Sequence, residues 1–211
     1  MMRLFDFLFP PRADEIAVRD ISIDDFLVKV SPSLVTCTRP ATITLLPFHD
    51  PVVRSAIHEA KYHGSARAFE LLALALADYL RDADDVGRTT SNTFLIPVPL
   101  GKERRKERGY NQIEEVAKLA GKELGMQVET DLLIRTRETI SQISLPREER
   151  EKNLRGAFIV SPKLEERRRI DPTCTYILID DVITTGATLQ SAIDALKSAG
   201  ALHIIPLALA H

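Results

Sequence analysis

The sequence contains no tryptophan, and aromatic residues make up only 6% of its 211 positions. Proteins that bind single-stranded nucleic acid without sequence preference stack the bases on aromatic side chains beside cations. Tyr110 is the one aromatic residue within a basic segment. The net charge of −2 also gives no general attraction for a polyanion. The scarcity of aromatic residues and the slightly negative net charge therefore argue against strong DNA binding.

Cysteines and long apolar runs are scarce as well. Cys37 and Cys174 are far apart and belong to no paired motif, which predicts buried thiols in a reducing compartment. The longest apolar run, 71–77, is flanked by acids and is too short to cross a membrane. The first ten residues contain Asp6 and end at Pro10, too early for a secretory signal. We therefore expect a cytoplasmic protein without membrane insertion, whose oligomeric state the sequence leaves open.

The composition is that of a globular protein, with 45% apolar and 27% charged residues. That is enough for one core, or for one domain with a small appendage. We expect a small module over residues 1–47 and an α/β domain over 48–211. The module contains three short apolar stretches that could be strands, 21–23, 26–28 and 43–45. Helices are predicted over 51–63 and 66–81.

The most informative stretch begins at Tyr176. The continuous apolar run from Tyr176 to Ile179 predicts a strand covered on both faces, followed by Asp180 and Asp181. A loop over 182–186 leads into a helix that ends before Gly200, and the run 204–209 predicts another strand. Strand, loop, helix and strand make one βαβ unit, which predicts a parallel sheet.

This geometry favours a phosphate ligand. A loop entering a helix presents free N–H groups and the positive end of the helix dipole. Thr184, Thr185 and Thr188 add hydroxyl donors, and Gly186 allows close approach of the backbone. The two carboxylates can accept hydrogen bonds from sugar hydroxyls or hold Mg²⁺ through water. A ribose 5-phosphate fits both parts, whereas the alternative is a tight turn with a threonine cap and two acids by chance.

A basic segment follows the predicted strand 93–98. Residues 101–112 carry five basic and two acidic side chains in what we expect to be a turn before the helix 113–124. Because the segment also follows the carboxyl end of a strand, we expect it to line the same rim as the acid pair. Its cations suit a diphosphate beside the ribose. The candidates are Lys102, Arg104, Arg105 and Arg108, and the alternative is a solvated charge run.

After a strand predicted over 127–134 comes a long polar segment, 135–156. A loop of this length in a compact domain is usually functional or disordered. We interpret it as a basic lid that closes over the substrates, with Arg137 and Arg147 as candidate ligands of the pyrophosphate. A short solvated helix over 147–154 is the alternative, and a lid could contain it.

Residues 176–188 resemble the 5-phosphoribosyl-1-pyrophosphate (PRPP) signature of the type I phosphoribosyltransferases. The resemblance implies a fold with a parallel sheet flanked by helices. It also implies that Asp180 and Asp181 contact the ribose 2′- and 3′-hydroxyls and act indirectly on the Mg²⁺ that accompanies PRPP. The implied 5′-phosphate loop consists of Val182, Ile183, Thr184, Thr185, Gly186, Ala187 and Thr188.

A second resemblance covers most of the chain. The stretches 97–100, 108–112, 133–142, 149–153 and 156–158 are similar to the ComF family, as are 57–64 and the opening 4–12. This family is phosphoribosyltransferase-like and is linked to competence, the uptake of DNA in natural transformation. One departure is clear, because the family commonly has a zinc ribbon with paired cysteines, whereas residues 13–40 contain only Cys37. We therefore expect no zinc.

These resemblances leave three functions open. The first is an enzyme that transfers ribose 5-phosphate from PRPP to an unknown acceptor and releases pyrophosphate. The second is a non-catalytic protein that binds PRPP or a nucleotide and contacts single-stranded DNA or partners in the uptake machinery. The third is a regulator that senses PRPP, since a fold alone does not fix a function.

Overall fold

The computed structural model describes residues 11–83, 92–136, 156–162 and 170–211. Its helices are α2 (Ala13–Asp20), α3 (Ile23–Leu27), α4 (Pro51–Tyr62), α5 (Ala66–Asp82), α7 (Lys102–Arg108), α8 (Gln112–Leu124) and α11 (Ala187–Ser198). Its strands are β1 (Ser33–Val35), β2 (Thr42–Leu46), β3 (Thr93–Pro97), β4 (Gln127–Val128), β5 (Leu133–Arg135), β6 (Phe158–Val160), β7 (Thr175–Val182) and β8 (His203–Ala210).

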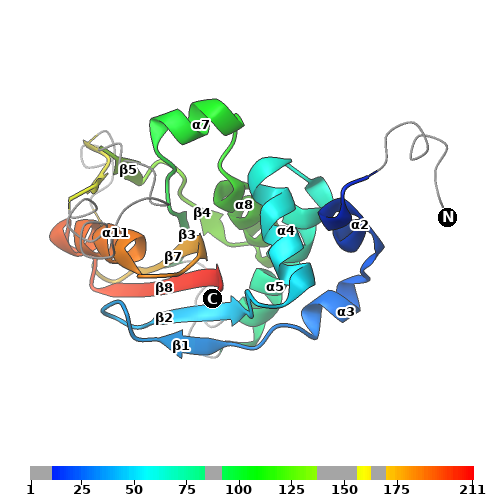
Figure 1. The fold of residues 1–211 in the computed structure, drawn as a ribbon. Coiled ribbons are helices and arrows are strands. Elements are labelled where there is room, and N and C mark those ends of the chain that lie inside the picture. Colours follow the sequence, from blue (N-terminus) through cyan, green and yellow to red (C-terminus); the bar gives the residue numbers. More distant parts are fainter. Residues whose placement is uncertain (1–10, 84–91, 137–155, 163–169) are drawn as a thin grey trace.

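Six strands form the main sheet, in the order β1-β2-β8-β7-β3-β4 (Figure 1). Every neighbouring pair is parallel except β1 and β2, which are antiparallel. The strands β5 and β6 form a separate antiparallel pair. Helices cover both faces of the main sheet, which confirms the predicted α/β class with a mostly parallel sheet. Because β3, β7 and β8 are parallel, their carboxyl ends lie at one edge.

The central strand β7 separates two hydrophobic cores. Ile177 and Ile179 lie in the core with residues of α4, α5 and α8, whereas Tyr176 and Leu178 lie in the core with α11 and β6. This alternation follows from strand geometry, in which consecutive side chains point to opposite faces. Both sets are buried, as the continuous apolar run predicts.

Side-chain caps fix where α4 and α8 begin. Asp50 accepts hydrogen bonds from Val52 N and Val53 N at the start of α4, and Pro51 occupies the first helical turn. At the start of α8, buried Asn111 accepts from Ile113 N and donates to Val98 O, which ties the helix to the end of β3. Among the described residues, no helix is both long enough and apolar enough to cross a membrane.

Residues 11–46 add helices and strands to this frame. The predicted strands at 21–23 and 26–28 are wrong, because Ser22 accepts from Asp25 N and starts the helix α3. The strand predicted at 43–45 is confirmed as part of β2, which pairs with β8 in the main sheet. The division of the chain at residue 47 stays a prediction.

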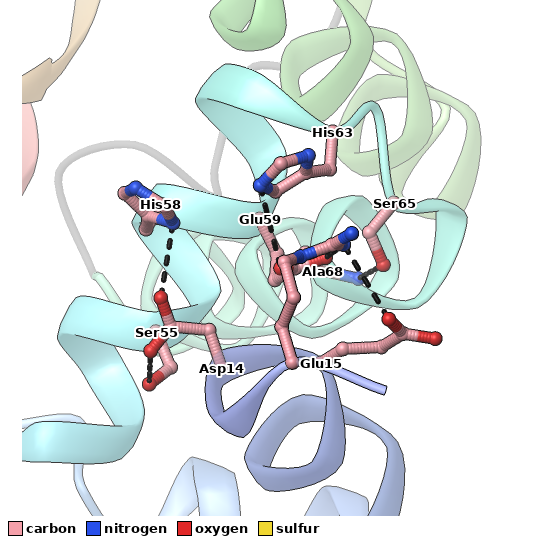
Figure 2. A network of polar contacts seen from close by, with 9 residues as sticks. Asp14, Glu15, Ser55, His58, Glu59, His63, Ser65 and Ala68 are labelled. Carbon is pink, nitrogen blue, oxygen red and sulfur yellow. Dashed lines mark hydrogen bonds and ion pairs between the residues drawn. The ribbon is translucent and has the colours of Figure 1, made fainter. Parts of the chain in front are cut away.

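A polar network joins α2 to α4 (Figure 2). Arg12, just before α2, donates to both oxygens of Glu59, whose side chain is only 2% exposed. Asp14 contacts His58 Nδ1 at 3.0 Å and accepts from Ser55 Oγ at 2.7 Å. A buried carboxylate is costly unless it is paired, so Arg12 compensates for the burial of Glu59.

The turn at 36–41 packs against α11, which contacts it from its first and last turns. Gln190 Oε1 accepts from Arg39 N, and Lys197 Nζ donates to Arg39 O. Cys37 is exposed, which corrects the expectation that it is buried, whereas Cys174 is buried as predicted. Gly186 lies beside this turn with φ +74°, and a Cβ built on it would lie 2.6 Å from Cys37 Sγ.

We predict that Gly186→Ala destabilises the protein more than Gly125→Ala, because both glycines have positive φ but only Gly186 faces a close neighbour. The backbone conformation alone costs about 1–2 kcal/mol for a residue with a Cβ. The overlap with Cys37 and Thr38 adds to that cost at Gly186. Urea unfolding of the two variants measures the difference, and equal losses would show that the 36–41 turn does not press on Gly186.

Candidate functional site

The acid pair lies at the carboxyl edge of the sheet, inside the last part of β7. The strand continues through Asp180 and Asp181 to Val182, three residues beyond the apolar run from which it was predicted. This extension follows from pairing, because Asp180 and Val182 remain in register with Ala208 and Ala210 of β8. Since consecutive strand residues point to opposite faces, Asp180 lies toward α11 and Asp181 toward α4 and α8.

The predicted phosphate loop joins β7 to α11. Gly186 adopts the left-handed conformation immediately before the helix and offers no side-chain cap itself, while Ala187 N donates to Thr185 Oγ1 at 3.4 Å. Thr184 is exposed, while Thr185, Ala187 and Thr188 are partly exposed. The first N–H groups of the helix have no acceptor within the helix and point toward the loop. Beside them lies a hollow of about 460 Å³, whose lining includes Cys37, Thr185 and Gln190.

Two residues from different helices bind the carboxylate of Asp181. Its Oδ1 lies 3.0 Å from Lys61 Nζ at the end of α4, and Gln112 Nε2 at the start of α8 donates to its Oδ2. Neither Lys61 nor Gln112 was predicted as a site residue. The available signal was indirect, since both lie within stretches that resemble the ComF family, 57–64 and 108–112.

Asp180 lies in a different electrostatic environment. Loss of hydration raises the pKa of its carboxyl to about 7, and the negative charge of Asp181 adds to the effect. The hydrogen bond from Asp181 N and the positive charges of Lys61 and Arg135 act in the opposite direction on this pKa but are weaker. Near neutral pH the strand end therefore holds one carboxyl that exchanges its proton readily.

The basic segment is a helix and not the predicted turn. Residues 102–108 form α7, which ends at Gly109 in the left-handed conformation. Arg108 donates to Gln112 Oε1 at 2.9 Å, so this cation reaches the acid pair through one amide. Arg105 instead pairs with Glu114 at 3.2 Å. Lys102 is exposed and Arg104 is partly exposed on the same helix.

Two candidate lid residues, Arg137 and Arg147, lie outside the described residues. The polar segment 135–156 starts at Arg135, the last residue of the three-residue strand β5. The prediction joined 127–134 into one strand, but the structure has two short strands there, β4 and β5. The main sheet contains only Gln127 and Val128 of that stretch, and β5 pairs with β6. The pyrophosphate role of these arginines and of α7 stays a prediction.

Two groups of side chains are candidates for binding a metal ion, the acid pair and a cluster at the end of α4. Asp180 and Asp181 point to opposite faces, and Asp181 is already bonded by Lys61, so the pair fits Mg²⁺ only through its water shell. At the end of α4, His58, Glu59 and His63 place ligand atoms within 4.8 Å of one another (Figure 2). However, Arg12 already neutralises Glu59 there, so we assign this cluster to the α2–α4 network.

Comparison with known proteins gives distant homologues. No family model matches the chain. The chain is 32% identical over 133 residues to Competence protein F of Haemophilus influenzae, a match that covers 63% of this chain and 56% of that protein. It is 29% identical over 155 residues to the DNA utilization protein YhgH of Shigella flexneri, covering 73% and 65% of the two chains. The chain thus matches less than two thirds of each relative's length, and this distant homology confirms the resemblance predicted from the sequence.

The chain is also similar to a solved structure. The adenine phosphoribosyltransferase of Leishmania tarentolae is 14% identical to this chain, with a TM-score of 0.45. The superposition covers 83% of this chain and 79% of the other.

The raised pKa of Asp180 predicts a pH-dependent effect of Asp180→Asn. Because folding favours the neutral acid, ionisation of Asp180 lowers the stability of the wild type as pH rises from about 4 to about 7. The amide cannot ionise, so the variant should match the wild type at pH 4 and melt roughly 5 °C higher at pH 8. Thermal unfolding in buffers free of phosphate and divalent cations tests this. A variant that melts at or below the wild-type temperature at pH 8 would contradict the raised pKa.

Proposed function

We propose that the chain binds a phosphorylated ribose, with PRPP as its ligand. One observation carries the proposal: two carboxyls lie in the last three residues of β7, and a four-residue loop ending at Gly186 leads from the strand to the N-terminus of α11. The loop and helix suit a phosphate, and the carboxyls suit sugar hydroxyls one loop away. The ligand class follows from having both parts in one site.

The reaction that such a site supports is transfer of ribose 5-phosphate to an acceptor. The bond between C1 of the ribose and the pyrophosphate oxygen breaks, and its electron pair leaves with the pyrophosphate. A lone pair of the acceptor then forms the new bond to C1, and the acceptor loses its proton to solvent. Little covalent work falls on the protein, which mainly positions the ribose and stabilises charge.

The residues divide this work between them. The loop from Val182 to Thr188 would hold the 5′-phosphate, and Asp180 and Asp181 would accept from the ribose hydroxyls. Arg108 of α7 is linked to the acid pair through Gln112, which accepts from Arg108 and donates to Asp181. Mg²⁺ bound to the ligand would offset the charge of the pyrophosphate, and Asp180 would meet its water shell.

The biological context that we propose is the handling of incoming DNA. The printed names of the relatives refer to competence and to DNA utilization. A phosphoribosyl-binding protein could serve that process either by modifying an acceptor or by responding to PRPP as a signal.

Calorimetric titration with PRPP and Mg²⁺ tests the ligand. We expect the double variant Asp180→Asn, Asp181→Asn to bind at least about 100-fold more weakly, because both carboxyl acceptors of the ribose hydroxyls are lost. Asp24→Asn, which removes an exposed acid on α3, is the matched control and should bind as the wild type does. Pyrophosphate release on addition of nucleobases then separates an enzyme from a binding protein. Absence of heat from the wild type at millimolar PRPP would overturn the proposed ligand.

A second candidate function is supported by the surface at the end of α4. Tyr62 is 57% exposed, and its ring lies under the guanidinium of Arg108, with 5.1 Å between Arg108 Cζ and the ring centroid. The centroid of the His58 ring lies 4.7 Å from the centroid of the Tyr62 ring and 5.6 Å from the centroid of the His63 ring. Exposed rings beside the cations of α7 are what single-stranded DNA needs for stacking and phosphate contact. No local sequence pattern indicates this pairing, because the rings and the cations come from different segments of the chain.

We predict that Tyr62→Ala lowers the affinity for a labelled oligothymidylate by roughly 5- to 100-fold, the loss of one stacked base. Tyr62→Phe keeps the ring and should retain most of the affinity. Fluorescence anisotropy at two salt concentrations measures both variants, and wild-type binding should weaken steeply with salt. Unchanged binding by Tyr62→Ala would remove this surface as the DNA contact.

A further inference from the structure

The carboxylate of Asp181 has almost no free hydrogen-bonding capacity. A carboxylate offers about four lone-pair positions. Asp181 Oδ1 lies 3.0 Å from Lys61 Nζ and accepts a hydrogen bond from Val182 N at 2.6 Å. Asp181 Oδ2 accepts a hydrogen bond from Gln112 Nε2. Counting the described residues, three of the four positions are filled, and the remaining one is on Oδ2. Asp181 is therefore oriented before any ligand arrives.

The two donors that orient Asp181 are themselves held in place. Gln112 is buried, and its Oε1 accepts from Arg108 at 2.9 Å. Arg108 in turn lies over the ring of Tyr62, the neighbour of Lys61 on α4. The contacts thus close a ring through α4, α7, α8 and β7. Within this closed set of contacts, Arg108 binds the amide oxygen of Gln112. The orientation of the amide is therefore fixed, and its N–H group faces Asp181.

Lys61 is placed to act on the acid and not on the phosphate loop. Its side chain is 21% exposed and that of Asp181 is 13% exposed, so the pair is largely withdrawn from water. Asp181 points toward α4 and α8, on the opposite face of β7 from α11. The N-terminus of α11, where a phosphate would bind, belongs to the other face.

We propose that Lys61 and Gln112 are positioning residues that aim the free lone pair of Asp181 at a ribose hydroxyl, and so make the site select ribose 5-phosphate over inorganic phosphate. This inference rests on the proposed function. It assigns the sugar part of the recognition to helices α4 and α8 and leaves the phosphate part to the loop before α11. Loss of either donor frees the carboxylate to rotate, while the phosphate loop keeps its geometry.

The test compares the affinities for ribose 5-phosphate and for inorganic phosphate by calorimetry. Lys61→Met should weaken ribose 5-phosphate binding roughly tenfold, the loss expected when a charge-assisted hydrogen bond no longer fixes its acceptor. Phosphate binding should not change. Lys118→Met is the matched control, because Lys118 pairs with Glu114 and Glu115 on α8 and does not contact Asp181. Gln112→Leu offers a second route to the same selective loss if Lys61→Met does not fold.

A double-mutant cycle separates positioning from direct contact. In the Asp181→Asn background, Lys61→Met should have no further effect on ribose 5-phosphate. Equal loss of both ligands, or a loss that persists in that background, would mean that Lys61 contacts the phosphate itself and would overturn the inference. Unchanged sugar binding by both Lys61→Met and Gln112→Leu would overturn it as well. A wild type that does not prefer ribose 5-phosphate to phosphate would instead overturn the proposed function on which the inference rests.

Discussion

The contact between Asp181 and its two partners, Lys61 and Gln112, is the interaction on which the arrangement of the site depends. It joins the central strand β7 to the helices α4 and α8 at the carboxyl edge of the sheet. A charged pair that is largely withdrawn from water is stable only when its geometry is good and the remaining polar atoms are satisfied. The bond of Arg108 to Gln112 meets that requirement and brings the basic helix α7 into the same network.

The position of the acid pair within a strand, and not in a loop, gives the two carboxyls separate surroundings. Asp181 is paired and oriented, whereas Asp180 faces the other side of the sheet with its pKa raised by loss of hydration. The same residue type at adjacent positions can therefore hold a fixed negative charge on one face and a titrating group on the other. A ligand that engages both must lie across the end of the strand.

The sequence predicted those parts of the fold that local patterns determine. The apolar run 176–179, the helices 51–63 and 66–81 and the final strand 204–209 were right because their periodicity matches their burial. The basic helix α7 was missed although lysine, arginine and glutamate favour helices and Gly109 supplies a stop signal. Ser22 likewise caps a helix where short apolar stretches indicated strands.

The site was only partly predictable for a different reason. The acids and the phosphate loop are contiguous in sequence, so their chemistry could be inferred from spacing. Gln112 and Asp181 are separated by 69 positions, and Lys61 comes from another helix again. No local pattern connects such residues, and only the folding of α4 and α8 onto one face of β7 brings them together. The contact between Tyr62 and Arg108 could not be predicted for the same reason, because the two residues come from different helices.

The central claim is that the carboxyl edge of β7 and the start of α11 form one ribose phosphate site. A crystal structure of the protein grown with ribose 5-phosphate tests this most directly. We expect the phosphate within the loop 182–188, bonded to backbone N–H groups at the start of α11, and the ribose hydroxyls within hydrogen-bond distance of Asp180 and Asp181. A ligand bound elsewhere, or a phosphate in the loop with its sugar turned away from both acids, would contradict the account.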